Sequence, residues 1–342
     1  MLRIAVIGAG HWGPNLISNF HANDRSRVAW VVDRDAARIE VVRRRFPDVR
    51  TSANIDDALQ DPNVDALVIA TPTRTHYELT KQALDAGKHV LVEKPLTDSV
   101  ETSMALCKLA EVVERVLLVG HVFVYNDAAR HVKQRIESGD LGRIYYISMM
   151  RTNLGPIRGD VDAAWDLAAH DISLASFWLD AWPESASAVG GSYINAGIAD
   201  VVFSTLRYPG EVLVNLHTSW LNPRKARDIT VVGDKQMLTF DDVNVSEPIR
   251  IYDKQVEHDS RRPALVDSLE SFRMSVHDGG IAVPSVPASE PLRNECEHFL
   301  DCVLDGESPL SGGREGLAVV RVLDAISRSL EGRGREMAVE IG

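Results

Sequence analysis

Three side chains have types and positions suited to proton transfer: Lys94, Asp166 and His170. Lys94 ends an apolar run and precedes Pro95, which cannot continue the hydrogen bonding of a strand. Asp166 and His170 are four residues apart, so they share one face if their segment is helical. An ammonium stabilises a developing alkoxide, and an imidazole accepts a hydroxyl proton near neutral pH. The three residues therefore predict chemistry on an alcohol or a ketone.

Each of these residues also has a simpler interpretation. Lys94 can be a surface lysine that pairs with a carboxylate such as Glu93. Asp166 can cap the N-terminus of a helix, and His170 can be a hydrogen-bonded histidine of the core. Residue type alone leaves these alternatives open.

A glycine-rich turn predicts a dinucleotide site. Gly8, Gly10 and Gly13, with His11 and Trp12 between them, lie between an expected strand and an expected helix. In this context glycines allow the backbone to approach a pyrophosphate, which the helix N-terminus then binds. The alternative is that the glycines only form a tight turn.

Asp33 indicates which dinucleotide binds. It ends the second expected strand, 20 residues after Gly13, where a carboxylate accepts hydrogen bonds from the adenosine ribose. The same carboxylate would repel a 2′-phosphate, so NAD is favoured over NADP, although the neighbouring Arg34 would partly offset that repulsion.

Other cofactor contacts are expected where further strands end. Ligands of open α/β sheets bind outside the carboxyl ends of the strands. His76 is expected either to contact the cofactor or to cap the next helix. The remaining expected contacts are Thr71, Pro72, Thr73, Glu93 and Lys94, of which the last two should face the nicotinamide half.

The elements that must position these residues follow from apolar patterning. Apolar runs without strict alternation are typical of parallel strands buried on both faces. The alternation of such runs with helical segments predicts a doubly wound parallel sheet, that is, a Rossmann-type α/β domain over residues 1–120. Strands are expected at 2–7, 28–33, 65–70, 89–94 and 116–120, and helices at 13–22, 35–46, 76–86 and 99–114.

After Gly120 the pattern changes to runs separated by turn residues, which predicts an α+β domain over 121–342 with an open, mainly antiparallel sheet. The final helices are expected to pack back on the first domain. Strands are expected at 143–151, 185–194, 200–208, 211–220, 227–233, 236–241 and 248–252, and helices at 126–138, 166–180, 290–305 and 314–331.

Composition excludes several classes of protein. The 342 residues carry a net charge of −12, which argues against nonspecific binding to nucleic acid or to an anionic membrane. Cys107, Cys296 and Cys302 form no metal-binding or disulfide pattern. The N-terminus has no stretch apolar enough for a signal peptide or a membrane span. We therefore expect a cytoplasmic protein without a metal.

The motifs in their order resemble those of the Gfo/Idh/MocA oxidoreductases. They are GAGHWG at 8–13, ATP-x-x-x-H at 70–76, VEKP at 92–95, GH at 120–121 and D-x-x-x-H at 166–170. The resemblance implies that Lys94, Asp166 and His170 form the catalytic group. It also implies a Lys94–Pro95 peptide that is often cis, and a second-domain sheet that often mediates homodimers or homotetramers.

Further segments resemble a nucleotide-sugar branch of this family, the UDP-N-acetylglucosamine 3-dehydrogenases and the related uronate 3-dehydrogenases. They are RTNLG at 151–155, WDLAAHD at 165–171, TSWLNPRKAR at 218–227 and EPLRNECEHFLDC at 290–302. This resemblance implies oxidation of a sugar C3 hydroxyl to a ketone. The expected substrate-binding residues are His121, Tyr125, Asn126, Arg151, Asn153, Asp166 and His170.

Two features bear on the substrate. Arg224, Lys225 and Arg227 form a basic cluster that either binds a diphosphate or is a solvated loop. The run from His121 to Asn126 lacks an arginine that many family members carry there. The contacts with the sugar at this point are therefore expected to differ from those of such members.

The leading hypothesis is an NAD-dependent dehydrogenase acting on a nucleotide-activated hexose. The alternatives are a sugar ketoreductase of the same family, an inositol or glucose dehydrogenase, and a NAD-binding regulator without turnover. An intact set of Lys94, Asp166 and His170 argues against the regulator, because a sensor needs no proton relay.

Overall fold

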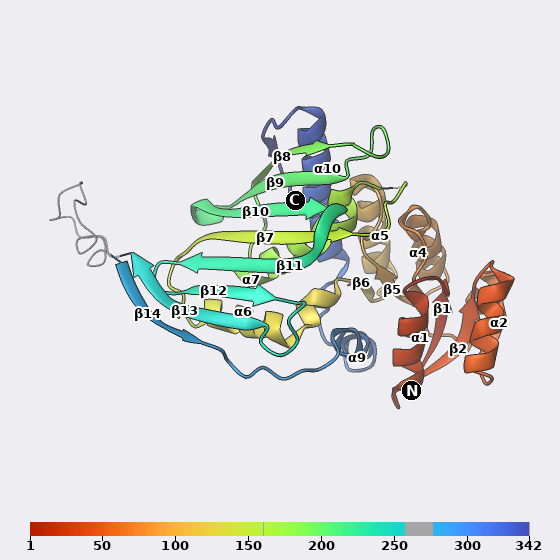
Figure 1. Cartoon of the computed structure of the whole chain (residues 1–342). Helices are drawn as coiled ribbons and strands as arrows, with labels where there is room; N and C mark the ends of the chain where they lie inside the picture. Colours follow the sequence, from red (N-terminus) through yellow and green to blue (C-terminus); the bar gives the residue numbers. More distant parts are fainter. Residues whose placement is uncertain (160, 257–275, 342) are drawn as a thin grey trace. The chain divides into compact units, whose positions relative to one another are not determined.

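The computed structural model describes residues 1–159, 161–256 and 276–341. Contacts between residues divide the chain into two units (Figure 1). The first unit contains Met1–Asn126 and Ser289–Asp324, and the second contains Asp127–Ala288 and Ala325–Gly342.

The first unit is built on a six-stranded sheet in the order β3-β2-β1-β4-β5-β6, with every pairing parallel. The order reverses direction between β1 and β4, as in a doubly wound sheet. This confirms the predicted Rossmann-type sheet. The strands are β1 (Leu2–Ile7), β2 (Ser26–Val32), β3 (Arg50–Ser52), β4 (Ala66–Ile69), β5 (His89–Glu93) and β6 (Leu117–Gly120).

In the first unit, each helix from α1 to α5 comes after a strand of the sheet in sequence. Two further helices, α9 and α10, come from the end of the sequence. The short β3 and α3 were not predicted, because three or four residues are too few for a periodic pattern. The helices are α1 (Gly13–Ala22), α2 (Ala36–Arg45), α3 (Asp56–Leu59), α4 (His76–Asp85), α5 (Val100–Val112), α9 (Pro291–Leu304) and the first part of α10 (Gly313–Glu331).

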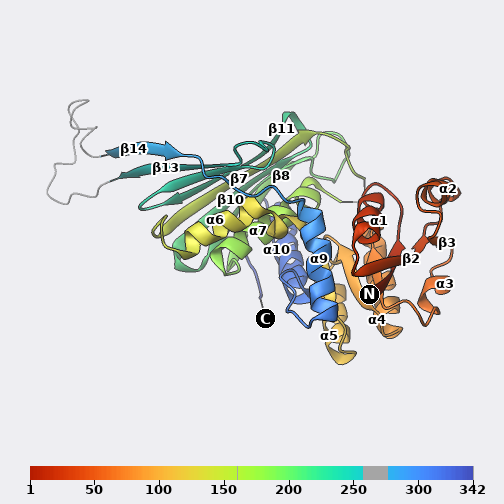
Figure 2. The same ribbon diagram turned by 90° about the horizontal axis from the view of Figure 1, so that it is seen from below.

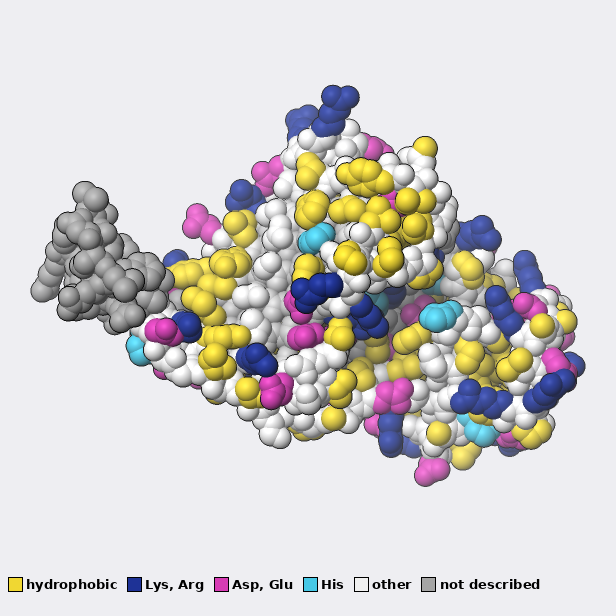
Figure 3. Space-filling model, in the orientation of Figure 1, with side chains coloured by type: hydrophobic (Ala, Val, Ile, Leu, Met, Phe, Trp, Pro, Cys, Tyr) yellow, Lys and Arg dark blue, Asp and Glu magenta, His cyan; other side chains and the backbone are white. Residues whose placement is uncertain are grey.

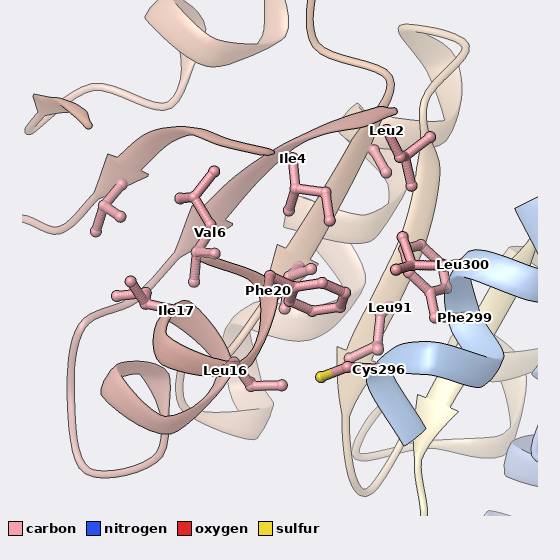
Figure 4. Close-up of a cluster of buried hydrophobic side chains, with 14 of the residues drawn as sticks. Leu2, Ile4, Val6, Leu16, Ile17, Phe20, Leu91, Cys296, Phe299 and Leu300 are labelled. Atoms are coloured by element: carbon pink, nitrogen blue, oxygen red, sulfur yellow. The ribbon is translucent and has the colours of Figure 1, made fainter. Parts of the chain in front are cut away.

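Helix α9 completes the core of this unit. Phe299 on α9 meets Phe20 on α1 edge to face, with ring centroids 6.2 Å apart. Figure 4 shows Cys296, Phe299 and Leu300 of α9 among buried side chains of α1, β1 and β5. The apolar face of α9 is therefore buried by residues almost 300 positions away in sequence.

The edge strand β6 is covered by the segment before α10. The amide of Val119 donates to the carbonyl of Ser311 at 2.7 Å, and Leu118 forms an isolated antiparallel bridge with Gly312. The Ser311 hydroxyl donates back to the carbonyl of Val119 at 2.7 Å. These bonds pair backbone groups that an open edge would expose.

The second unit contains a nine-stranded sheet in the order β14-β13-β12-β11-β7-β10-β9-β8-β15. Among the described strands of this second sheet, β7 and β10 form the one parallel pair, so the prediction of a mainly antiparallel sheet is confirmed. The strands are β7 (Ile144–Leu154), β8 (Ser185–Gly191), β9 (Val201–Tyr208), β10 (Val212–Ser219), β11 (Leu221–Gly233), β12 (Met237–Asp241), β13 (Ile249–Val256), β14 (Val276–Ala282) and β15 (Met337–Ala338).

Three strands differ from the sequence-based expectation. β11 begins at Leu221 rather than at 227, because its first residues bulge against β7 and do not show a regular strand pattern. β14 and β15 were not predicted. β14 contains Gly279 and Gly280, and β15 has two residues, so neither shows a strand signature.

Helices cover one face of this sheet, and no helix of the described residues covers the other face. Figure 2 shows α6 (Asp127–Glu137) and α7 (Ala169–Leu179) along one face. The Trp178 indole of α7 donates to the Ala129 carbonyl of α6 at 2.8 Å. Hydrophobic side chains, including Val189 and Phe203, gather on the surface over β8–β10 (Figure 3). Within the described part of the chain, no helix is long and apolar enough to cross a membrane.

Candidate active site

The glycine turn of the first unit is fixed by close packing. Gly8 has φ of 98°, and a Cβ there would lie 2.5 Å from the Ala70 carbonyl oxygen. A Cβ on Gly13 would overlap the Gly8 carbonyl oxygen. Helix α1 begins at Gly13 without a side-chain cap, so amides of its first turn remain available to an anion. This arrangement fits the pyrophosphate of a dinucleotide.

Asp33 connects β2 to this turn. Its Oδ2 accepts from the Ala9 amide at 2.7 Å, and its Oδ1 accepts from the Asp35 amide at 2.8 Å. A carboxylate oxygen can accept two hydrogen bonds, so Oδ1 can accept a further one from a ribose hydroxyl. The carboxylate thus lies beside the glycine turn, and its contact with a ribose remains a prediction.

Arg38 is a neighbour of this site that the sequence reasoning missed. Its Nη1 lies 3.5 Å from Asp33 Oδ2 and 3.4 Å from the position of a Cβ on Gly10. The arginine named from the sequence, Arg34, has an exposed side chain. The sequence could have indicated Arg38. Asp35 is a typical N-cap residue, and a helix that begins after it has Arg38 in its first turn, near Asp33.

His76 has a structural position that neither sequence interpretation anticipated. Its ring lies between the carbonyls of Thr71 and Pro95, with both N···O distances 2.9 Å. Burial lowers the pKa of His76, against the opposing effect of the carbonyls. The neutral ring donates to one carbonyl at a time, and it holds together the segments that follow β4 and β5. Cofactor contact by His76, Thr71, Pro72 and Thr73 remains a prediction.

A cluster of ionisable groups lies where β5 and β6 end. The carboxylate of Glu93 packs against Gly120, with Oε2 3.2 Å from the position a Cβ would take there. Burial raises the pKa of Glu93 to about 7, while the Lys94 charge and a hydrogen bond from the Trp12 side chain oppose the rise. The Lys94–Pro95 peptide is cis, as the resemblance implied.

His121 belongs to the same cluster. Its side chain is 1% exposed, and neither ring nitrogen has a hydrogen-bond partner among the described residues. Burial and the positive charge of Lys94 lower the pKa of His121 to about 3, so its imidazole is neutral. A role for His121 in substrate binding remains a prediction.

The structure places Tyr125 in the core of the first unit. Its hydroxyl lies 2.9 Å from the Ser311 hydroxyl, and its carbonyl accepts from Asn294 at 3.0 Å. The tyrosine is fully buried, so these bonds anchor the segment that ends at Asn126. Substrate contact by Tyr125 and Asn126 remains a prediction.

In the second unit, Asp166 lies in a π-helical turn (Ala164–Ala168) that leads into α7. Its Oδ1 accepts from Arg158 at 3.1 Å, and its Oδ2 accepts from the Trp220 indole at 3.1 Å. Asp166 lies inside this turn, and Asp162 before it accepts from the Trp165 amide at 2.9 Å, so the interpretation of Asp166 as a helix cap is wrong. π-Turns occur frequently at functional sites.

His170 lies in the first turn of α7, beside a buried ion pair. The next residue, Asp171, accepts two hydrogen bonds from Arg151 on β7. The pair fixes the start of α7, and with it the backbone of His170, to the central strand of the sheet. Arg151 itself is 5% exposed. Its predicted contact with substrate, and that of Asn153, stay predictions.

The basic cluster lies on a strand. Arg224 and Lys225 are exposed in the bulged first part of β11, and Arg227 pairs with Asp242 at 2.8 Å. These residues are therefore not in a loop, and diphosphate binding by them is untested.

The candidate residues thus form two groups. In the first unit they lie at the carboxyl ends of β1, β2, β4, β5 and β6, and in the second unit they lie around the start of α7. Sequence reasoning missed Arg158, Asp171 and Trp220, whose contacts with the second group span 8 to 54 residues of sequence.

Comparison with known proteins agrees with this geometry. Residues 2–121 match the family described as "Oxidoreductase family, NAD-binding Rossmann fold", and residues 129–239 match the "GFO/IDH/MocA C-terminal domain". A UDP-N-acetylglucosamine 3-dehydrogenase from Acidithiobacillus ferrooxidans is 31% identical over 71% of this chain and 75% of its own. A solved structure of that enzyme, GnnA, covers 97% of this chain and 98% of its own with a TM-score of 0.82 and 25% identity.

An inositol dehydrogenase aligns with more of this chain than the UDP-N-acetylglucosamine 3-dehydrogenase does. The scyllo-inositol 2-dehydrogenase (NAD(+)) of Bacillus subtilis is 26% identical over 90% of this chain and 88% of its own. The two relatives named here have names that indicate different substrates, so membership of the family does not by itself select the substrate.

Proposed function

Because the chain belongs to the Gfo/Idh/MocA family of NAD-binding oxidoreductases, we propose that it oxidises the C3 hydroxyl of a nucleotide-activated hexose. The substrate we propose is of the UDP-N-acetylglucosamine type. The observation that carries this choice is the 31% identity to a UDP-N-acetylglucosamine 3-dehydrogenase. The product is a 3-keto sugar, and two electrons pass to the cofactor as hydride.

NAD fits the first unit. The uncapped start of α1 suits the pyrophosphate, and Asp33 suits an unphosphorylated ribose. When bound, the nicotinamide supplies the hydride acceptor.

We assign the proton transfer of this reaction to three side chains. In this proposal His170 accepts the proton of the sugar hydroxyl, and Lys94 stabilises the negative charge that develops on the oxygen. Asp166, held by Arg158 and Trp220, orients the acid–base pair. The pH profile of kcat decides which of His170 and Lys94 is the formal base.

An inositol dehydrogenase is the second candidate, favoured by the match to the scyllo-inositol enzyme over 90% of the chain. Purified protein should be tested for NADH formation with UDP-N-acetylglucosamine, its uronate, free glucose, and myo- and scyllo-inositol. A coupled aminotransferase should remove the ketone, because an unfavourable equilibrium hides oxidation. Turnover confined to an inositol would reject the nucleotide-sugar proposal.

The variants Lys94→Ala and His170→Ala test the catalytic assignment. Each should lower kcat by about 10²–10⁴-fold, the usual contribution of a positioned acid or base. Full activity in His170→Ala would remove that residue from the mechanism. Tight NAD binding without turnover of any substrate, in either direction, would favour a regulator. Reduction of the 3-keto sugar without measurable oxidation would favour a ketoreductase.

We also propose a homodimer or homotetramer that forms through the open face of the nine-stranded sheet. Its support is the exposed hydrophobic surface over β8–β10, where Phe203 is 46% and Val189 is 54% exposed. Contiguous apolar surface of this kind marks an interaction site in many proteins.

A further inference from the structure

A pocket of about 390 Å³ lies on the first unit, and none of the sites described above uses the residues that line it. Three arginines and one carboxylate give it an excess of positive charge, in a protein whose net charge is −12. Arginines that face the same space repel one another, and an anion between them removes that repulsion. The lining residues are Arg3, Arg27, Ala29, Asp48, Arg50 and Asn63.

The pocket lies toward the amino ends of the parallel strands. Arg3 of β1 and Arg27 of β2 are partners in register, so they are adjacent across the two strands. Leu2 and Ile4 belong to the core that α1 and α9 complete (Figure 4), and side chains alternate along a strand, so Arg3 lies on the opposite face. Gly8 of the glycine turn follows Arg3 by five residues, which is about 16 Å of strand. The pocket is therefore separate from the expected dinucleotide site.

Arg50 is held by neighbouring side chains of the same unit. Its guanidinium lies over the Trp30 ring, 4.3 Å from the ring centroid, and forms an ion pair with Asp61. The Asp61 side chain is 8% exposed and also accepts from the Trp30 indole at 2.9 Å. A guanidinium carries five N–H donors, so these contacts leave donors of Arg50 for a ligand in the pocket.

Arg3 is connected to the same carboxylate through Asn63. The Arg3 Nη1 donates to Asn63 Oδ1 at 2.7 Å. Asn63 donates to Asp61 Oδ1 from its backbone amide at 2.9 Å and from its side-chain amide at 3.1 Å. Hydrogen bonds, first that from Trp30, hold the pKa of Asp61 well below its ordinary value, so this carboxylate stays ionised. Asp61 therefore orients two of the three arginines of the pocket.

Arg27 is the third arginine. Among the described residues its guanidinium has no hydrogen-bond partner, and its charge acts on Asp48 through space. Asp48 is bonded to a histidine, because His21 Nε2 lies 3.2 Å from its Oδ1. One carboxylate that is already engaged in this way does not neutralise three arginines.

The chemistry of the pocket fits phosphate groups. The paired N–H donors of a guanidinium match two oxygens of one phosphate, and this bidentate contact is characteristic of arginine. The volume of about 390 Å³ is in the range of small-molecule sites and exceeds the needs of a single phosphate. A diphosphate offers more negative charge and more acceptor oxygens than a single phosphate, so it suits three arginines better.

We propose that this pocket binds a diphosphate-bearing anion, at a site separate from the dinucleotide site of the same unit. The recognised chemistry is the diphosphate, whether it is free or part of a nucleotide. Binding requires no sugar substrate and no turnover, so its test is independent of the proposed function.

The test is isothermal titration calorimetry of the full-length protein saturated with NADH, which blocks the dinucleotide site. Pyrophosphate is titrated at constant ionic strength, so that general screening does not change. We expect binding with a Kd below about 1 mM, and no measurable binding would overturn the proposal. A titration with ADP distinguishes the source: tighter binding than that of pyrophosphate assigns a nucleotide, and weaker binding assigns the free diphosphate. Tighter binding of citrate than of pyrophosphate would overturn the assignment of a diphosphate.

Two variants of the pocket should change the affinity in opposite directions. Arg27→Gln should weaken pyrophosphate binding about tenfold, because it removes a charge-assisted contact. Asp48→Asn should strengthen binding, because it removes a negative charge from the lining and retains an acceptor for His21. Wild-type affinity in Arg27→Gln, or weaker binding in both variants, would overturn the proposal. Circular dichroism establishes that both variants fold.

The matched control is Arg44→Gln. Arg44 belongs to the same unit, its side chain is 79% exposed, and it pairs with Glu40 on α2. This variant should bind pyrophosphate as the wild type does. An equal loss of affinity in Arg44→Gln and Arg27→Gln would show a nonspecific effect of net charge and would overturn the proposal.

Modification of arginines by phenylglyoxal locates the bound anion in the wild-type protein. Mass spectrometry gives the rate of modification at each arginine, and all of those compared are exposed. Pyrophosphate should slow the modification of Arg3, Arg27 and Arg50 severalfold and leave that of Arg44 unchanged. Unchanged rates at the three arginines of the pocket would place the anion elsewhere and overturn the proposal.

Discussion

The guanidinium group of Arg151 donates two hydrogen bonds to a single oxygen of Asp171, at 2.6 and 2.9 Å. The two side chains are 6% and 2% exposed. The other carboxylate oxygen of Asp171 has no hydrogen-bond partner in the described part of the chain. This buried pair joins β7 to the first turn of α7, which contains His170.

Removal of Arg151 should therefore destabilise the protein strongly. Arg151→Met leaves Asp171 buried without its cation, which typically costs about 3–5 kcal/mol. Urea unfolding followed by tryptophan fluorescence measures the loss. The control is Arg250→Met, which breaks an exposed pair with Glu247 and should change stability far less. The double variant Arg151→Met/Asp171→Leu should recover part of the lost free energy of unfolding. If Arg151→Met and Arg250→Met lowered the free energy of unfolding equally, this expectation would be wrong.

Asp33 should determine the preference for NAD over NADP. Asp33→Asn removes the charge that repels a 2′-phosphate and retains an acceptor for the Ala9 amide. We expect the ratio of NADP to NAD affinity to rise about tenfold, which corresponds to 1.4 kcal/mol. Fluorescence titration with each reduced cofactor measures this ratio. Asp35→Asn, a nearby exposed acid that remains a competent helix cap, should leave the ratio unchanged.

The buried acids predict a stability that falls as pH rises. Burial raises the pKa of Glu93 to about 7 and raises that of Glu295 well above its ordinary value. The folded state therefore holds protons that the unfolded state has already released. Their contribution to stability is complete below the unfolded pKa, near 4.5, and is lost as pH rises through the folded values.

Replacement of Glu295 by glutamine should remove its part of this dependence. The wild-type unfolding equilibrium constant should rise by up to about tenfold per pH unit relative to Glu295→Gln, since one proton is linked to unfolding. Urea unfolding from pH 5 to 9 measures the difference. Glu297→Gln, the exposed control, should show a parallel curve to the wild type. A constant difference between wild type and Glu295→Gln would show that Glu295 does not titrate in this range.

Disruption of the open sheet face should dissociate the proposed oligomer. Phe203 is exposed on β9, and its ring stacks on His217 with centroids 4.4 Å apart. Phe203→Glu places a charge in the proposed interface, where desolvation is unfavourable. Light scattering should give a smaller mass for this variant than for the wild type. Val112→Glu, at an exposed hydrophobic residue on α5, is the control. A monomeric wild type would contradict the proposal.

The first unit was largely predictable because its signals are local. The glycine turn, the acid that follows it and the apolar runs each depend on neighbouring residues, and the structure shows the parallel sheet they predict. Asp33 lies against the turn because β1 and β2 are adjacent parallel strands. The order of strands follows from the alternation of strands and helices.

The remaining contacts depend on residues far apart in sequence. Trp220 donates to Asp166 across 54 positions, and Ser311 meets Tyr125 across 186. Glu295 was not singled out, because an acid within a helix normally indicates a solvated face. Only the packing of α9 against α1 and residues 122–125 reveals that this acid is buried.

The coverage of β6 by Ser311 and Gly312 has a consequence for biosynthesis. A ribosome makes the six strands of the first sheet long before it makes these residues. Until they leave the exit tunnel, the nascent chain carries an unpaired β-edge at Leu118 and Val119 and lacks α9 over its apolar face. Exposed edges and apolar faces promote aggregation, so this stage of translation is where the polypeptide most needs a chaperone.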